Sequence, residues 1–256
     1  MASVPQQTSV PAPTQGGGSH SQNELPFRLE VLLEPKGFIR GIEFVLAICM
    51  FATTAGYNSM FSFHVNCTSS GTNRTTYPQD IQYYFGYPFS FESIKTTCFG
   101  PVFLGESPSG SAKFFVVVGV FAMLYTIAAL VWYVVLEVKY LQYEIVSIVD
   151  FVATAVFTLL FFIASCAWAA GVSTVKFWTN LDNLTQEGGI LSSCNEDGNT
   201  CSSLQSASYG ALNISILFGF LNVLVWGGNV WFVWKETPWF RARSENQTGG
   251  NLDNKV

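Results

Sequence analysis

The chain has 256 residues, of which 11% are charged, whereas an ordinary soluble protein carries about 25%. Hydrophobic residues make up 49% of it, with 23 Phe and 7 Trp, and the mean hydropathy is +0.32. So few charges could not cover a soluble core of that size, so the composition excludes an ordinary soluble globular protein. The net charge of −5 is small and spread out, which argues against a nucleic-acid-binding role.

The N-terminal segment is polar and contains no apolar run. Residues 1–25 are rich in Pro, Gln, Ser and Gly. A cleavable signal peptide would need a basic start and an apolar stretch, so we expect residues 1–33 to form a disordered cytosolic tail. The first membrane helix must then act as the insertion signal.

Four apolar stretches are long enough to cross a bilayer, whose hydrocarbon core needs about 20 residues of helix. A soluble helix of that length would carry a polar face, and these carry almost none. The sequence therefore predicts an all-α membrane protein with a four-helix domain at 34–239 and a short cytosolic C-terminal tail at 240–256. The predicted spans are 42–63, 114–136, 146–170 and 211–234.

Basic residues indicate the orientation of these spans, because cytosolic flanks carry an excess of Lys and Arg. An even number of spans places both termini on one side. The Lys and Arg on that side are Arg28, Lys36, Arg40, Lys139, Lys235, Arg241, Arg243 and Lys255. Fewer lie in the two longer loops, 64–113 and 171–210, so we expect cytosolic termini and luminal loops.

The two long loops also carry the features of an oxidising lumen. Each contains two cysteines, and disulfides persist in such a compartment. Four cysteines allow three pairings, and we prefer the within-loop pairs Cys67–Cys98 and Cys194–Cys201. The same loops contain glycosylation acceptors at Asn66, Asn73 and Asn183.

The first loop is rich in aromatic residues, which predicts an ordered structure rather than a flexible linker. Short strands are expected at 83–85 and 89–91, separated by a break at 86–88. The complete prediction is therefore a four-helix bundle with two disulfide-bearing luminal loops, the first containing short β-strands.

Two carboxylates lie within the predicted spans, Glu43 in the first and Asp150 in the third, both near the cytosolic face. A charge inside a membrane is costly and so suggests a function. The structural interpretation is an interfacial anchor or an interhelical pair with Arg40, Lys36 or Lys139. The alternative is a proton or ion relay, which would need further charges at mid-depth.

The fourth span carries a polar stripe. Gly219, Asn222, Trp226 and Asn229 follow helical spacing and share one face. Small residues allow helices to approach closely, and an amide in hydrocarbon needs a partner. This face is expected to pack against another helix, either inside the bundle or as a subunit contact in an oligomer.

No catalytic, cofactor-binding or metal-binding motif appears. The chain lacks a P-loop, a dinucleotide fingerprint, a His-Glu-x-x-His and a Cys-x-x-Cys motif. His20 and His64 lie in different regions, and the sequence offers His64 no obvious partner. An enzymatic function, a cofactor and a metal ion are therefore not expected.

Several blocks in order resemble the synaptophysin family of MARVEL-domain tetraspan vesicle proteins, which includes synaptoporin, pantophysin and mitsugumin. The resemblance covers about residues 34–239, and the short C-terminal tail is similar to that of the short-tailed members. The blocks are EPxGFI at 34–39, YPF at 87–89, SAxFFV at 111–116, DFxATAVF at 150–157, AWA at 167–169, FGFLN at 218–222, WFV at 231–233 and KET at 235–237.

The resemblance implies a glycosylated, multi-pass protein of synaptic, secretory or transport vesicles that organises membrane and partners during exocytosis. The implied partners are membrane lipid including cholesterol, a synaptobrevin-type vesicle SNARE and further copies of the chain. An oligomeric pore and a junctional adhesion protein are the alternatives. The pore would need a hydrophilic lining, for which the stripe in the fourth span is the only candidate. The loops lack the cysteine and Trp patterns of connexins, claudins and tetraspanins.

Overall fold

Four long helices form one bundle in the computed structural model, which describes residues 35–68, 76–96, 100–140, 144–187, 189–195, 198–235, 237–240 and 242–243. Helix α1 neighbours α2 and α5, and α3 neighbours the same two helices, so the four close into a ring. Each is long and apolar enough to cross a membrane, which confirms the predicted fold class. The helices are α1 (Pro35–Ala55), α2 (Ser109–Tyr140), α3 (Glu144–Trp178) and α5 (Gly210–Trp234).

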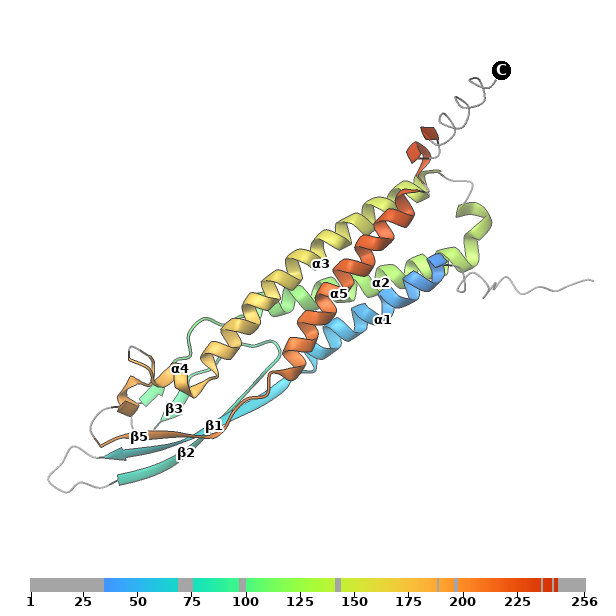
Figure 1. Ribbon diagram of the computed structural model, residues 1–256. Helices are drawn as coiled ribbons and strands as arrows, with labels where there is room; N and C mark the ends of the chain where they lie inside the picture. Colours follow the sequence, from blue (N-terminus) through green and yellow to red (C-terminus); the bar gives the residue numbers. More distant parts are fainter. Residues whose placement is uncertain are drawn as a thin grey trace, which may run out of the picture.

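The two ends of the bundle differ (Figure 1). One end carries every β-strand of the described residues, and we call it the sheet end. At the other, the terminal end, α1 begins, α2 ends, α3 begins and α5 ends.

The predicted first span, 42–63, was wrong at both ends, because α1 runs from Pro35 to Ala55. Its apolar signal came from two adjacent elements. After Gly56 the chain enters strand β1 (Asn58–Thr68), in which Phe61, Phe63 and Val65 are buried at alternate positions. That spacing is typical of a strand with one buried face, and a hydropathy window cannot separate it from a preceding apolar helix.

The other spans agree better with the prediction. The span predicted at 211–234 corresponds to α5, whereas 114–136 and 146–170 each cover only part of a longer helix. Helix α3 has 35 residues, so it is about 50 Å long and extends beyond a hydrocarbon core of about 30 Å. Its last turns pack Val172 and Val175 against the sheet-end core.

A three-stranded antiparallel sheet extends from the bundle, in the order β2-β1-β5. Strand β1 pairs along its whole length with β2 (Thr76–Gly86), and its other edge pairs with β5 (Thr200–Gln205). The second loop therefore contributes a strand to the sheet built by the first. A separate small ribbon joins β3 (Ile94–Thr96) and β4 (Gly100–Val102).

The short strands expected in the first loop were only partly right. Residues 83–85 belong to the eleven-residue strand β2, whereas residues 89–91 are not a strand. Phe89 has a φ of 61°, which ends extended pairing, and its side chain is fully buried. The Phe89 ring packs against Trp168 of α3, with centroids 5.1 Å apart, so this turn attaches the sheet to the bundle.

The core of the sheet end is largely aromatic. The ring of Phe61 packs against Phe63, Tyr83 and Phe85, with centroid distances of 5.4 to 6.3 Å. The short helix α4 (Leu181–Thr185) and the 3-10 turn η2 (Ser192–Asn195) add leucines and Cys194 to the same core. Burial of this apolar surface stabilises the sheet end.

Candidate functional site

A group of buried charges lies at the terminal end of the bundle, and we call Arg40, Glu43 and Asp150 the charge cluster. Arg40 and Glu43 are one helical turn apart on α1, so their side chains share a face. The Arg40 Nη1 donates to Glu43 Oε2 at 2.8 Å. Both side chains are within 1% of complete burial, so the pair lies inside the bundle rather than at its surface.

Asp150 connects this pair to α3. Its Oδ1 accepts a hydrogen bond from Arg40 Nη2 at 2.5 Å, and its side chain is 8% exposed. Thr154, one turn further along α3, accepts from the same Nη2 at 3.1 Å and donates to the Asp150 carbonyl. Arg40 therefore bridges two carboxylates on two helices.

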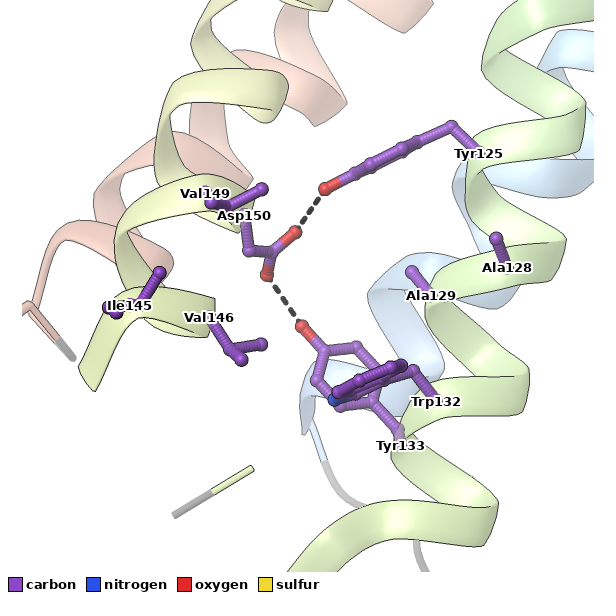
Figure 2. Close-up of a pocket in the computed structure, with 9 residues that line it drawn as sticks. All are labelled: Tyr125, Ala128, Ala129, Trp132, Tyr133, Ile145, Val146, Val149 and Asp150. Atoms are coloured by element: carbon purple, nitrogen blue, oxygen red, sulfur yellow. Dashed lines mark hydrogen bonds between the residues drawn. The ribbon is translucent and has the colours of Figure 1, made fainter. Parts of the chain in front are cut away.

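Two tyrosines of α2 complete the surroundings of Asp150. Tyr125 donates to Oδ1, and Tyr133 donates to Oδ2 at 2.6 Å (Figure 2). They are eight residues apart, so they lie about two turns apart on one face of α2. A carboxylate with several donors is far less costly to bury than a bare one.

Helix α5 contributes Asn229 and Trp226. Asn229 Nδ2 donates to Glu43 Oε1 at 2.8 Å. The Arg40 guanidinium lies 5.3 Å from the ring centroid of Tyr125 and 5.7 Å from that of Trp226, within the range of cation–π attraction. All four long helices thus meet around one arginine.

Sequence analysis singled out two of these charged residues, Glu43 and Asp150, and left open whether they anchor at the interface, pair between helices or form a relay. Glu43 and Asp150 do not reach out to the interface, because both are buried and share Arg40 as partner. The side chains of Lys36 and Lys139 lie outside the described residues. Sequence reasoning missed Tyr125, Tyr133 and Thr154, although the one-turn spacing of Asp150 and Thr154 was a usable signal.

The polar stripe of α5 faces the inside of this chain. Gly219, Asn222, Trp226 and Asn229 are all buried in the bundle. A Cβ on Gly219 would lie 2.5 Å from Ser165 Oγ of α3, so the glycine permits close helix approach. Asn222 donates to the Phe218 carbonyl, while Ser165 Oγ, Asn222 Oδ1 and Trp226 Nε1 have no hydrogen-bond partner among the described residues.

The disulfides lie at the sheet end. The predicted pair Cys194–Cys201 is confirmed, with Cα atoms 5.5 Å apart. Cys67 is also in a disulfide, and its predicted partner Cys98 lies outside the described residues, so that pairing remains a prediction. Cys49 and Cys166 are free thiols in the long helices.

The glycosylation acceptors occupy three different settings. Asn73 lies outside the described residues. Asn183 lies in α4, partly exposed, with its side-chain amide donating to the Phe177 carbonyl. Asn66 lies in the central strand β1, where its amide donates to Thr200 Oγ1 of β5 at 3.3 Å. Asn183 is therefore the better placed of the two described acceptors.

The exposed face of the sheet carries one titratable pair. His64 of β1 lies opposite Asp80 of β2, and its Nδ1 bonds to that carboxylate. Its Nε2 lies 3.1 Å from Asn66 Oδ1. The bond to Asp80 raises the pKa of His64 above its ordinary value. The expectation that His64 has no partner was therefore wrong, because the pairing depends on strand register. Both ring nitrogens of His64 lie within hydrogen-bonding distance of a side-chain oxygen.

Within the described residues, no group of three or more His, Cys, Asp or Glu side chains could hold a metal ion. The contacts that the charge cluster makes are ion pairs and hydrogen bonds. It can bind and orient polar groups inside the bundle.

One comparison with known proteins bears on these features. The model of the MARVEL family, described as a membrane-associating domain, matches residues 31–232. The matched range contains α1, α2 and α3, most of α5, both loop regions and every residue of the charge cluster.

Proposed function

The chain belongs to the MARVEL family of membrane-associating proteins, and on that premise we propose that it organises the membrane and partners of secretory or synaptic-type vesicles without catalysing a reaction. The family match and the four spanning helices make it a multi-pass membrane protein. The vesicle assignment rests on the sequence blocks that resemble the synaptophysin family.

The proposal includes an orientation, with the sheet end luminal and both termini cytosolic. Two observations support it. The disulfide Cys194–Cys201 and the acceptor Asn183 lie at the sheet end, and disulfides persist in oxidising compartments. Eight of the twelve Lys and Arg belong, by sequence, to the two termini, to the start of α1 and to the stretch between the second and third spans, whereas four, Lys113 and Lys176 among them, lie on the sheet-end side, which is the bias that the positive-inside rule expects of a cytosolic face.

The proposed role in organising membrane and partners rests on where the polar side chains of the long helices lie. Arg40, Glu43 and Asp150 are buried within one chain, and so is the α5 stripe. The outer surface of the four helices exposes large apolar side chains such as Leu159, Leu217 and Leu224. A bundle with these polar side chains inside and apolar side chains outside is suited to contact lipid and other membrane proteins. It disfavours an oligomeric pore, whose lining would have come from the stripe.

The proposed partners follow from the resemblance. They are cholesterol-containing membrane, a synaptobrevin-type SNARE and further copies of this chain. Contact between copies would use the apolar outer faces of the helices, because the stripe residues Gly219, Asn222, Trp226 and Asn229 are already packed inside the bundle.

Isolation of the compartment tests the proposal. A tagged chain is expressed in secretory cells, the labelled membranes are immunoisolated, and cross-linked neighbours are identified. We expect small vesicles and a synaptobrevin-type SNARE. Recovery at cell junctions without a SNARE would refute the function.

Glycosidase treatment of the same membranes tests the orientation separately. We expect a mobility shift that Asn66→Gln/Asn73→Gln/Asn183→Gln removes. Cleavage of the sheet end by protease added to intact vesicles would refute a luminal sheet.

A further inference from the structure

A groove of about 300 Å³ lies between α2 and α3 at the terminal end, directly beside the charge cluster. Figure 2 shows the Asp150 carboxylate at this groove, pointing from α3 toward the hydroxyls of Tyr125 and Tyr133 on α2. The remaining lining is apolar: Ala128, Ala129, Trp132, Ile145, Val146 and Val149. The groove therefore combines a hydrocarbon wall with one buried carboxylate.

The groove opens to the surroundings of the bundle. Ile145 is 72% exposed, Val149 60% and Trp132 40%. The groove lies toward the terminal ends of both apolar spans, because the span of α3 begins at Ile145 and the sequence of α2 becomes charged at Glu137 and Lys139, shortly after its lining residues. A lipid entering from the bilayer could place its chain along the apolar wall and its head at Asp150.

The charges next to the groove do not balance. Among the described side chains, the single positive charge of Arg40 faces two carboxylates, Glu43 and Asp150. With all three ionised, the cluster carries one excess negative charge. In a low-dielectric environment such an excess is relieved either by protonation of a carboxylate or by a bound monocation.

Asp150 can also accept another hydrogen bond. Its Oδ1 accepts from Arg40 and Tyr125, whereas its Oδ2 accepts only from Tyr133 among the described residues. A carboxylate oxygen can accept two. Trp132 lines the same groove, and an indole ring can attract an ammonium group.

We propose that this groove binds a membrane amphiphile with a single ammonium head and one hydrocarbon chain. The ammonium donates to Asp150 Oδ2 and neutralises the excess charge of the cluster, and the chain lies against Ala129, Val146 and Val149. A neutral hydroxyl lipid could make the hydrogen bond and would leave the charge excess in place. A zwitterionic phospholipid head would bring its phosphate toward two carboxylates. The site does not depend on the compartment in which the protein resides.

Thermal unfolding of the purified full-length chain in a neutral detergent tests this site, with hexadecylamine as the probe and hexadecanol as the uncharged match. At neutral pH the amine is protonated. A ligand that binds the folded state raises the unfolding temperature in a saturable way. We expect the amine to bind at least about tenfold more tightly than the alcohol, because only the amine gains from the carboxylate charge.

Three variants assign the effect to the groove and to its charge. Ala129→Phe fills the groove and should abolish the response, whereas Ala170→Phe, on an exposed face of α3 outside the groove, should retain it. Glu43→Gln removes one negative charge without touching the groove, and should weaken amine binding at least about tenfold. Equal binding of amine and alcohol, an unchanged response in Ala129→Phe or Glu43→Gln, or no saturable response would each overturn the proposal.

Discussion

The terminal end and the sheet end of this bundle are held together by different interactions. At the terminal end, the four helices meet through one arginine, two carboxylates, an asparagine amide and two tyrosine hydroxyls. At the sheet end, the elements meet through packed aromatic rings, a continuous strand ladder and the disulfide Cys194–Cys201.

This difference follows from the solvent at each end. In lipid, burying an apolar face gains little, because the lipid chains are as apolar as leucine, so close packing and interhelical hydrogen bonds must give the helices their partners. In water, aromatic burial alone supplies a large driving force. The two kinds of packing meet where the ring of Phe89, from the sheet end, lies against Trp168 of helix α3.

The largest expected effect comes from removing the shared cation. Arg40→Met leaves Glu43 and Asp150 buried without a counter-charge, which should cost roughly 3 to 5 kcal/mol of stability. Thermal unfolding in detergent, followed by size-exclusion chromatography, measures the loss.

The matched control removes all three charges together. Arg40→Met/Glu43→Gln/Asp150→Asn should recover most of the stability, because no buried charge is left unpaired. If Arg40→Met unfolds at the wild-type temperature, the charge cluster does not hold the terminal end.

The second largest loss of stability is expected from a substitution in the aromatic core of the sheet end. Phe61 is 2% exposed and packs against three rings, so Phe61→Ala should cost about 3 kcal/mol. Tyr84→Ala on strand β2 is the control, since Tyr84 is 69% exposed and should change stability little. Proteolysis of the extramembrane part reports on this end. Equal sensitivity of the two variants would contradict an aromatic core.

The third effect concerns the disulfide of the sheet end. Cys194 and Cys201 are separated by 7 residues, and opening so short a loop should cost about 2 kcal/mol. Cys194→Ser/Cys201→Ser should therefore increase proteolysis near β5, while the helix content of the bundle stays unchanged. Cys49→Ser/Cys166→Ser removes two free thiols and should do neither. Loss of helix content in Cys194→Ser/Cys201→Ser would mean that the two ends are not independent.

The fourth expected change in stability comes from a glycine of α5 that lies between the two ends of the bundle. A Cβ on Gly219 would lie 2.5 Å from Ser165 Oγ and 2.9 Å from the Phe115 ring, so Gly219→Ala should cost about 1 to 2 kcal/mol. Gly228→Ala on the same helix meets nothing within 4 Å and should stabilise by about 0.5 to 1 kcal/mol. Thermal unfolding of the pair measures both. A lower unfolding temperature for Gly228→Ala than for Gly219→Ala would contradict this packing.

Local signals in the sequence predicted much of this architecture. Hydropathy located four helices, and the small and polar spacing of Gly219 and Asn222 marked a packing face of α5, which the structure places inside the bundle. These features depend on residues a few positions apart, which a single sequence displays directly. The end of α1 at Ala55 was missed, because an apolar helix followed by an amphipathic strand gives one continuous hydropathy signal.

Long-range pairing could not be predicted in the same way. Asp150 meets Arg40 across 110 positions, and Asn229 meets Glu43 across 186. Strand β5 joins β1 from the other loop, and this pairing depends on register rather than on composition. Tyr125 and Tyr133 were missed because a tyrosine in an apolar helix is equally typical of a membrane interface.

The smallest expected effect is a pH dependence confined to the sheet end. Because the bond to Asp80 raises the pKa of His64, the pair stabilises the folded state most at a pH below the ordinary histidine value. This contribution is lost as the pH rises through the folded pKa. Asp80→Asn should therefore lower the unfolding temperature at about pH 5.5 and have little effect at about pH 8.5. Glu187→Gln, on an exposed position of the second loop, is the control and should behave alike at both. The pair lies on the water-exposed sheet, so solvent screening keeps its effect far below that of the buried charge cluster. An equal effect of Asp80→Asn at the two pH values would show that His64 is not the titrating partner.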